Sequence, residues 1–437
     1  MQKLLIKGGY PLKGTIRLGG AKNASFKLMI ASLLSKGEVR LLNLSHIADV
    51  ENTKKIIQSL GVTVTSCGEK TFCLNSSLVK SFKIPDHLGI YSRASTMFIG
   101  PLVARFGKAV VPYPGGDKIG PRPLDRHFAG LRALGLVIKR KGNIIYTEGK
   151  LIGNKFRFSK NTHTGTETLL MAAVLAEGKT ILENASEEPE VDELISFLNK
   201  MGAKIRRQRR KIEIYGVKVL RPVSYKVMPD RNEAVSYAIA AIISGGDVVI
   251  ENARREYLEA FLAKLEEAGG GIEVENYGIR FYFKKTPKAV KITTLPHPGF
   301  MTDWQPLWAV LATQSQGTTL IIESVYLDRF GYVKNLVSMG AKINFFNPKV
   351  REPEHFYNFN LSRGWDKIPH GIEITGPSLL CSVKANISDL RAGATLVLAG
   401  LVAKKGQTVL ANIEQIDRGY EDLEIRLRHL GANIKRV

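Results

Sequence analysis

The sequence has few cysteines, no long apolar run and fewer acidic than basic residues. Its three cysteines, Cys67, Cys73 and Cys381, are an odd number without a CxxC pair. We therefore expect neither a disulfide framework nor a four-cysteine zinc site, and a reducing compartment fits best. No stretch approaches the roughly 18 apolar residues of a membrane-spanning helix, and the first residues lack the apolar core of a signal peptide. These absences predict a cytoplasmic protein without membrane insertion.

Several motifs that carry chemistry are also missing. No group of His, Cys or carboxylate residues has the spacing of metal ligands, and no GxSxG or dinucleotide-binding fingerprint occurs in a suitable context. The eight histidines are scattered along the chain. We therefore expect no metal centre, and the histidines are interpreted as mostly structural.

What is present is an ordinary globular composition with a large positive charge. The 437 residues are 44% hydrophobic and 24% charged, which predicts two or three folded domains at roughly 150 residues each. The net charge of +23 indicates an anionic partner: nucleic acid, a membrane surface or a phosphorylated substrate. The densest basic run, 204–211, resembles a nucleic-acid patch. We favour a solvated strand edge, because no aromatic residues are interleaved with it.

A repeated pattern organises the chain. Six helix-like segments each end at a glycine that precedes a strand-like run, and a second glycine lies 23 to 28 residues before each of these, closing an Ala/Leu-rich helix. The first set is Gly61, Gly135, Gly202, Gly269, Gly340 and Gly431, and the second is Gly37, Gly107, Gly178, Gly246, Gly317 and Gly406. The pattern predicts six α/β units grouped into two domains, with 345–369 as an inserted loop.

Two loops are candidate functional sites. Residues 19–24 join a strand to a helix and place Lys22 at the helix start, which suits an anion but is equally compatible with a simple glycine turn. Residues 112–123 contain four prolines and three glycines around Asp117, Lys118 and Arg122. We favour a functional lid over an ordinary surface connection for this second loop.

Two helix starts carry charged residues whose roles the spacing leaves open. Thr302 and Asp303 open an apolar helix, and periodicity alone favours an N-cap over a general base for them. Arg391 lies in the first turn of another helix, against the preference of the helix dipole. This indicates either an anion to bind or a salt bridge with Asp389.

Taken together, these segments resemble the enolpyruvyl transferases, and among them those that act on a nucleotide sugar. The resemblance runs nearly from end to end. It rests on Gly20-Ala21-Lys22-Asn23-Ala24, Arg93-Ala94-Ser95, Gly100-Pro101-Leu102-Val103-Ala104-Arg105-Phe106-Gly107, the Gly-Gly-x-x-Ile-Gly-x-Arg-Pro loop at 115–123, Glu188-Pro189-Glu190, Pro229-Asp230-Arg231, Thr302-Asp303, Asp389-Leu390-Arg391-Ala392 and Ile416-Asp417-Arg418-Gly419-Tyr420-Glu421.

The resemblance implies an α/β fold of two inside-out α/β barrel domains, each of three βαβαββ repeats, with the active site between the domains. The first domain would span 22–229 and carry the lid loop. The second would be discontinuous, 1–21 with 230–437. This expectation agrees with the six units counted from the glycines.

The implied reaction transfers the enolpyruvyl group of phosphoenolpyruvate to the 3′-hydroxyl of UDP-N-acetylglucosamine, releases phosphate and needs no cofactor. Lys22 and Asn23 would contact phosphoenolpyruvate, Arg122 its phosphate and Arg391 its carboxylate, and Asp303 would be the base at the sugar hydroxyl. The resemblance also assigns to the nucleotide-sugar site Arg93, Arg122, Pro123, Leu124, Asp125, Arg126, His163, Thr164, Gly165, Asp303 and Val325.

The chain departs from the usual family pattern at several positions. Most members carry a cysteine where this chain has Asp117, the position assigned to donate a proton to the methylene carbon. A carboxylic acid performs this role if the site keeps it protonated, which Lys118 would oppose. The replacement of cysteine by aspartate also predicts resistance to the epoxide antibiotic fosfomycin, which alkylates a thiolate in the cysteine-bearing relatives. Arg126 and His163 also differ from the usual small or apolar residues. A paralogue with another acceptor, and a nonenzymatic basic nucleic-acid-binding protein on the same scaffold, remain as alternatives.

Overall fold

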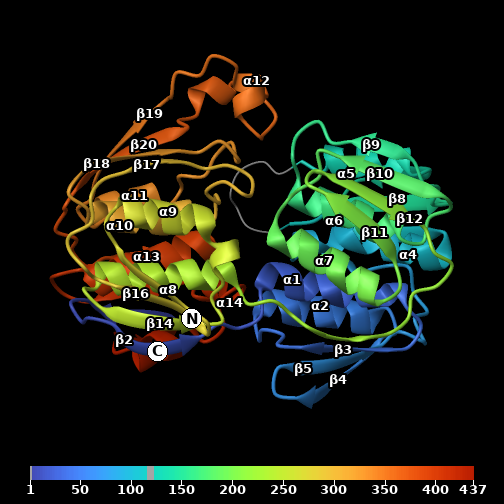
Figure 1. The fold of residues 1–437 in the computed structure, drawn as a ribbon, viewed down its shortest axis with the longest axis horizontal. Helices are drawn as coiled ribbons and strands as arrows, with labels where there is room; N and C mark the ends of the chain where they lie inside the picture. The colour runs from blue at the N-terminus through green and yellow to red at the C-terminus, as the bar shows by residue number, and fades with distance from the viewer. Residues whose placement is uncertain (1, 116–122) are drawn as a thin grey trace. The chain divides into compact units, whose positions relative to one another are not determined.

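The computed structural model describes residues 2–115 and 123–437, and these fall into two compact α/β units (Figure 1). Unit 1 contains residues 2–18 and 229–437, and unit 2 contains residues 19–115 and 123–228. No helix in these ranges is long and apolar enough to cross a membrane.

Unit 1 alternates strands and helices through most of its length. Its strands are β1 (Lys3–Lys7), β2 (Lys13–Arg17), β14 (Asp247–Glu251), β15 (Gly271–Glu275), β16 (Gly278–Tyr282), β17 (Lys291–Thr293), β18 (Gly317–Ile322), β19 (Lys342–Phe346), β20 (Gly371–Gly376), β21 (Lys384–Asn386), β22 (Thr408–Ala411) and β23 (Asn433–Arg436). Its helices are α8 (Arg231–Ile243), η3 (Arg255–Tyr257), α9 (Glu259–Glu267), α10 (Gln305–Thr313), α11 (Val333–Ser338), α12 (Pro353–Phe356), η4 (Trp365–Lys367), α13 (Leu390–Val402), α14 (Glu414–Asp417) and α15 (Leu423–His429).

Unit 2 follows the same plan. Its strands are β3 (Glu38–Leu42), β4 (Thr63–Gly68), β5 (Thr71–Asn75), β6 (Lys108–Pro112), β7 (Leu136–Lys141), β8 (Ile144–Gly149), β9 (Lys155–Arg157), β10 (Lys179–Glu183), β11 (Lys204–Gln208), β12 (Lys211–Tyr215) and β13 (Ser224–Lys226). Its helices are α1 (Lys22–Ala31), η1 (Ser32–Leu34), α2 (Ala48–Ser59), α3 (Asp86–Gly89), η2 (Arg93–Phe98), α4 (Ile99–Phe106), α5 (Asp125–Ala133), α6 (His163–Ala173) and α7 (Pro189–Lys200).

All six sheets share one strand order. In the sheet β11-β12-β10-β9, β9 and β10 are parallel, and the β11–β12 hairpin adds antiparallel to β10. The sheets β13-β3-β5-β4, β15-β16-β14-β2, β17-β18-β20-β19 and β21-β22-β1-β23 repeat this arrangement, and in β6-β8-β7 the first strand is reduced to a parallel bridge between Lys83 and Val110. The predicted βαβαββ repeats, three to a unit, are confirmed. The sheets are open and separate, so no closed barrel forms among the described residues.

Three repeats are completed by strands that are far apart in sequence, and in one of them β1 pairs with β22 and β23. In unit 1, β2 pairs in parallel with β14, placing Ile16 beside Ile250. In unit 2, β13 pairs in parallel with β3, placing Tyr225 beside Leu41. Unit 2 is therefore inserted into the connection between the first strand and the first helix of a unit 1 repeat.

The helices between the parallel strands form the interior of each unit. In unit 1, α8, α10 and α13 lie side by side, and all thirteen residues of α13 are buried (Figure 1). In unit 2, α1 and α6 contact the η2–α4 segment in the same way. A helix that is apolar on all sides must be covered on all sides, which explains why the sheets lie outside these helices.

The glycine pattern predicted the helix ends correctly. All six glycines of the first set have a positive φ, between 85° and 104°. Five of the second set do as well, but at the fourth position Gly245 (φ 71°) takes this conformation instead of Gly246. A Cβ on Gly246 would lie 2.1 Å from the Leu12 carbonyl oxygen, so close backbone approach explains the second glycine there.

The basic run at 204–211 forms the β11–β12 hairpin. β11 is the edge strand, and Arg207 and Arg210 pair with Asp192 at 2.8 Å and Glu187 at 2.9 Å. The interpretation as a solvated strand edge is confirmed.

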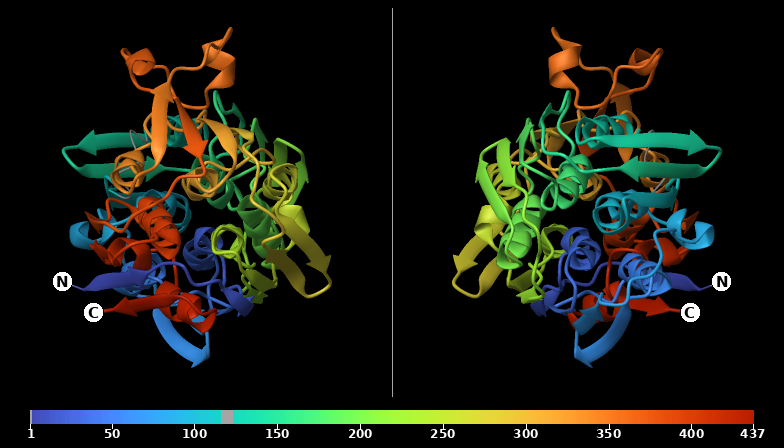
Figure 2. Two further views of the ribbon diagram at one scale, coloured as in Figure 1. Left: turned by 90° about the vertical axis from the view of Figure 1, so that its left-hand side faces the viewer. Right: turned by 90° about the vertical axis from the view of Figure 1, so that its right-hand side faces the viewer.

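Two sequence expectations need correction. Cys67 and Cys73 form a disulfide across the β4–β5 hairpin, although no disulfide was expected, because the hairpin brings together cysteines that are six residues apart. The 345–369 segment is a folded insertion rather than a plain loop. It contains α12, η4 and an aromatic cluster around Tyr357, Phe359 and Trp365, and both views of Figure 2 show it extending beyond β19 and β20.

Candidate active site

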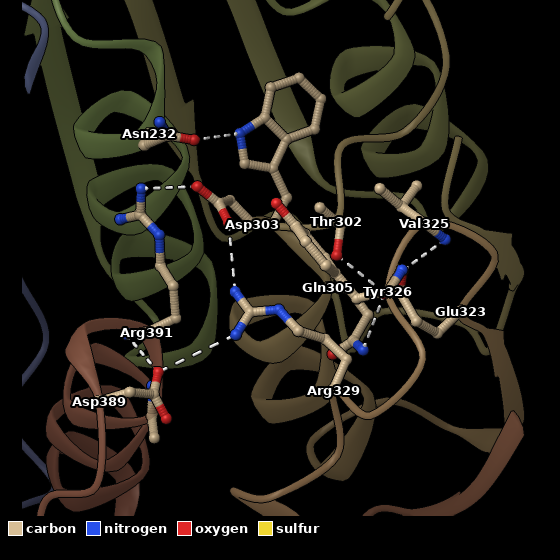
Figure 3. Close-up of polar contacts among 12 residues, drawn as sticks. Asn232, Thr302, Asp303, Gln305, Glu323, Val325, Tyr326, Arg329, Asp389 and Arg391 are labelled. Carbon is tan, nitrogen blue, oxygen red and sulfur yellow. Dashed lines mark hydrogen bonds and ion pairs between the residues drawn. The ribbon is translucent and has the colours of Figure 1, made fainter. Parts of the chain in front are cut away.

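In unit 1, Asp303 lies between two buried arginines (Figure 3). Its Oδ2 accepts a hydrogen bond from Arg391 Nη2 at 3.1 Å, and its Oδ1 accepts one from Arg329 Nη2 at 3.2 Å. The two guanidinium side chains are 6% and 3% exposed, whereas the Asp303 side chain is 20% exposed. The carboxylate is therefore the part of this cluster that a molecule in solution can reach.

The cluster forms at the starts of the three interior helices of unit 1. Asp230 and Asp389 are the N-caps of α8 and α13, and each carboxylate accepts two backbone N–H bonds, whereas Asp303 lies just before α10. Helix starts carry partial positive charge. Together with two guanidinium groups, they make this end of unit 1 suitable for an anion.

The cap interpretation of Thr302 and Asp303 is wrong. The N-cap of α10 is Trp304, which makes no side-chain cap hydrogen bond. Thr302 donates instead to Glu323 Oε2 at 2.9 Å. The proposed salt bridge between Arg391 and Asp389 is also wrong, because Asp389 caps the backbone while the guanidinium turns to Asp303.

Arg391 is anchored from its other side as well. Its Nη1 donates to the Tyr420 hydroxyl at 2.9 Å, and that hydroxyl shares a 2.7 Å hydrogen bond with Ser236. Burial acts to lower the pKa of Arg391, but the electrostatic influence of Tyr420, Asp303 and Asp230 outweighs it and raises the pKa above the ordinary value. The guanidinium is thus fixed in place and permanently charged.

Arg329 is held by a short loop after β18. Burial acts to lower its pKa, and the carboxylates of Asp303, Asp389 and Glu323 more than offset this effect. Buried Glu323 organises the loop, because its Oε1 accepts the backbone N–H groups of Val325 at 2.8 Å and Tyr326 at 3.0 Å. Burial raises the pKa of Glu323. Half-buried Val325 therefore occupies a defined position near the cluster, as the close-up shows (Figure 3).

Unused donors remain in this cluster. The Nε atoms of Arg329 and Arg391 are buried and have no hydrogen-bond partner among the described residues. Buried N–H groups normally find an acceptor, but these two donors remain unsatisfied in the part of the chain that the structure describes.

In unit 2, the predicted residues lie at the starts of the interior helices. Lys22 and Asn23 are the first residues of α1, and Lys22 is 8% exposed and pairs with Asp49 at 3.0 Å. Half-buried Arg93 is the first residue of η2, which packs against α1 and α6. Most of the predicted site residues that the structure describes therefore lie at helix starts, in both units.

The α5 and α6 starts lie next to each other. Pro123 and Leu124 precede α5, and Asp125 and Arg126 begin it. Arg126 donates to the Asn161 carbonyl at 3.2 Å, and burial lowers its pKa, an effect that Asp125 partly offsets. His163, Thr164 and Gly165 form the first turn of α6, where the N-cap Thr162 accepts the Gly165 N–H and Thr164 contacts His127 at 2.9 Å.

Two predicted residues, Asp117 and Arg122, lie outside the described residues, as does the rest of the 116–122 segment. Within the described ranges, no group of three or more His, Cys, Asp or Glu side chains is arranged to hold a metal ion.

The sequence reasoning missed several members of these clusters. Arg329 and Tyr420 contact predicted residues directly, and Lys27 and Glu167 lie beside His163. Tyr420 lay within a motif that the sequence had singled out. Nothing marks Arg329, whose surroundings are defined by tertiary contacts. The signal for Lys27 and Glu167 is a charged residue directly before or close to the apolar second half of its helix.

Comparison with known proteins gives a consistent result. The family described as EPSP synthase (3-phosphoshikimate 1-carboxyvinyltransferase) matches residues 6–427. Relatives from Idiomarina loihiensis (40% identical over 441 residues, 100% of both chains covered) and Sorangium cellulosum (41% over 440 residues, 100% of this chain and 99% of that protein) are both named UDP-N-acetylglucosamine 1-carboxyvinyltransferase.

Solved structures agree on the fold. The enolpyruvyl transferase NikO from Streptomyces tendae superimposes with a TM-score of 0.86 at 22% identity, covering 100% of this chain and 99% of that one. EPSP synthase from Acinetobacter baumannii gives 0.75 at 18% identity, with 100% of both chains covered. The repeats, the helix-start clusters and the full-length relatives lead to one assignment: the chain belongs to the EPSP synthase family of carboxyvinyltransferases.

Proposed function

We propose that the chain is a UDP-N-acetylglucosamine 1-carboxyvinyltransferase, which transfers the enolpyruvyl group of phosphoenolpyruvate to the 3′-hydroxyl of UDP-N-acetylglucosamine in the first committed step of peptidoglycan synthesis. The observation that carries the proposal is the identity of 38 to 41% over the whole chain to relatives of that name. The buried arginines around Asp303 support it, because phosphoenolpyruvate and the nucleotide sugar are both polyanions.

Asp303 and Arg391 carry the chemistry of unit 1. Arg391 binds the carboxylate of phosphoenolpyruvate, and Asp303 accepts the proton of the 3′-hydroxyl as the sugar oxygen adds to C2 and a proton adds to C3. The Asp303 side chain is 20% exposed, so its carboxylate is within reach of a substrate hydroxyl. Loss of phosphate from C2 and of a proton from C3 then regenerates the enol ether.

The other residues that the resemblance assigns bind the substrates. Lys22 and Asn23 contact phosphoenolpyruvate, and Arg122 contacts its phosphate. Arg93, Arg122 to Arg126, His163 to Gly165, Asp303 and Val325 line the nucleotide-sugar site. Asp117 is the proton donor to C3, in the position where most relatives carry a cysteine. The helix starts that carry Lys22 and His163 support these roles, because the partial positive charge of a helix start favours a bound anion.

The two units correspond in this proposal to the two domains of the family. The unit boundaries at 18/19 and 228/229 lie near the chain segments where the resemblance places the domain boundaries. Cytoplasmic location follows from the proposed substrates, and no cofactor takes part.

A phosphate-release assay with phosphoenolpyruvate tests the proposal. Each reaction contains one acceptor: UDP-N-acetylglucosamine, another UDP-sugar or shikimate 3-phosphate. We expect release with UDP-N-acetylglucosamine and a hundredfold or greater loss in Arg391→Ala and in Lys22→Ala, as for removal of a preorganised charge contact. Release with shikimate 3-phosphate alone would instead assign the activity named in the family description. Release with a different UDP-sugar would identify a paralogue.

A further inference from the structure

Three polar side chains of unit 2 form a cluster between α1 and α6. Lys27 Nζ lies 2.6 Å from Glu167 Oε1 and 2.9 Å from His163 Nε2, and the same histidine nitrogen lies 3.2 Å from Glu167 Oε1. The side chains of Lys27 and Glu167 are 2% and 0% exposed, and that of His163 is 21% exposed. Of the three residues, His163 is the one that reaches the surface.

Stability alone does not explain this cluster. Lys27 and Glu167 are buried in the interior of unit 2, and Glu167 Oε2 has no hydrogen-bond partner among the described residues. Replacing a buried ion pair by apolar residues of similar volume is often neutral or stabilising. A buried Lys–Glu pair with an unsatisfied oxygen therefore points to a role in organising the third member, His163.

The hydrogen-bond chemistry of lysine determines which ring nitrogen of His163 carries the proton. An ammonium group has three donors and no acceptor. His163 Nε2 faces Lys27 Nζ, which can only donate, at 2.9 Å, and Glu167 Oε1, which can only accept, at 3.2 Å. The shorter contact favours Nε2 as the acceptor of the lysine hydrogen bond. The proton of the neutral ring then lies on Nδ1, which is left as a donor.

The neighbours of His163 belong to the predicted nucleotide-sugar segment. His163 is the first residue of α6. On either side of it, Arg126 of α5 contacts the Asn161 carbonyl and His127 of α5 contacts the Thr164 hydroxyl. The ring therefore stands at a helix start already suited to an anion.

We propose that Lys27 and Glu167 are positioning residues that hold His163 with its proton on Nδ1, so that the ring presents a fixed hydrogen-bond donor to an oxygen of the nucleotide-sugar acceptor. His163 is then a specificity-determining residue for the acceptor. This inference rests on the proposed function for the identity of the substrate class, and the orientation of the ring rests on the geometry of unit 2.

The first test measures the tautomer directly in the substrate-free protein. Histidine-selective ¹⁵N labelling and NMR at pH 8 report which ring nitrogen carries the proton, and His163→Ser identifies the signal. We expect an Nδ1–H ring in the unaltered protein and loss of that preference in Lys27→Met/Glu167→Met. An Nε2–H ring in the unaltered protein, or an unchanged preference in the double variant, would overturn the proposal. An exposed pair of the same type, Lys150 with Glu177, supplies the control Lys150→Met/Glu177→Met.

The second test separates the two substrates kinetically and does not need the double variant to fold. His163→Ser should raise the KM for the acceptor about tenfold or more, as for loss of a hydrogen bond to a charged group, and leave the KM for phosphoenolpyruvate within about twofold. His163→Asn places an amide N–H near the Nδ1 position and should restore much of the affinity, whereas His163→Gln should not. Equal increases in both KM values, or equal behaviour of the two amide variants, would contradict the proposal.

Failure of this inference differs from failure of the proposed function. If UDP-N-acetylglucosamine does not support phosphate release, the proposed function is wrong. The tautomer measurement still decides the role of Lys27 and Glu167, and the KM comparison is made with whichever acceptor does support release.

Discussion

At the scale of single residues, asparagine ends the second strand of four repeats. Asn43, Asn184, Asn252 and Asn412 each follow such a strand with a φ between 54° and 65°. Asn43 donates to the Val227 carbonyl at 3.0 Å and Asn184 to the Phe158 carbonyl at 2.9 Å, in both cases at the end of the parallel first strand. Asparagine tolerates this left-handed conformation and ties the two strands together with its side chain.

Asp303→Asn tests both the chemistry and the electrostatics of the arginine cluster. The amide cannot accept a proton, so we expect turnover to fall by about 10²–10⁴. Stability should fall by about 3 kcal/mol, the lower end of the range for a broken buried ion pair, because the amide oxygen can still accept from one guanidinium. Kinetics and denaturant unfolding measure the two effects, with exposed Asp328→Asn as the control. A variant that retains a tenth of the activity would remove Asp303 from the role of base.

We expect Asp117 to determine the response to fosfomycin. A carboxylate is a weak nucleophile toward an epoxide compared with a thiolate, so the unaltered protein should show no time-dependent inactivation and no mass increase. Asp117→Cys should acquire both. Activity assays and intact-protein mass spectrometry measure the outcome. Modification of the unaltered protein would mean that another group is the reactive one.

At the scale of elements, each helix end in the repeats depends on a glycine whose backbone conformation other residues adopt poorly. Gly202 has a φ of 104°, and a Cβ there would meet nothing within 4 Å. Gly202→Ala therefore tests backbone conformation alone, and we expect a loss of about 1–2 kcal/mol. Denaturant unfolding should show a lower midpoint. Gly331→Ala is the matched control, because that site is equally open and has no positive φ. Equal effects in the two variants would contradict the argument.

The insertion should respond to pH through His370. This residue is 1% exposed, its Nε2 contacts the Trp365 carbonyl at 2.9 Å, and its buried Nδ1 has no partner among the described residues. Burial lowers the pKa of His370, so the unfolded segment takes up a proton near pH ~6.5 while the folded segment does so at lower pH. The contribution of His370 to the stability of the folded insertion is therefore present above about pH 6.5 and is lost as the pH falls.

Limited proteolysis of the 347–369 segment at pH 7.5 and 5.5 measures this effect. Cleavage should be faster at the lower pH in the unaltered protein, and His370→Phe should remove the difference. A pH difference that persists in the variant would assign the effect to another group.

The elements differ in how far the sequence could predict them. Helix ends marked by glycine were predictable because the φ requirement is local. The folded insertion was not, since its aromatic cluster joins Leu327 to residues 30 or more positions later. The Arg329–Asp303–Arg391 cluster was predictable in part. Helix starts drew attention to Asp303 and Arg391, but their pairing depends on how α10 and α13 pack.

At the scale of the whole molecule, a net charge of +23 attracts anions of every kind. The composition could not separate a nucleic-acid binder from an enzyme with anionic substrates, because charge does not specify chemistry. The full-length relatives favour the enzyme.

Salt dependence distinguishes the two roles experimentally. Long-range attraction of the substrates should make kcat/KM fall as the salt concentration rises, with kcat little changed, because the Debye length shortens. Binding to random DNA should be weak at physiological salt and have a shallow salt slope. A steep slope, as for a protein that neutralises many phosphates, would support a nucleic-acid-binding role.

The insertion of unit 2 into a unit 1 repeat also sets an order of events during synthesis. Unit 2 is encoded between β2 and α8, so all of its strands emerge before β14, the partner of β2, has been made. Domains generally fold as units as the chain emerges from the ribosome. Unit 2 can therefore fold first. During that time β2 remains unpaired, because more than two hundred further residues must be added before its partner β14 has been made.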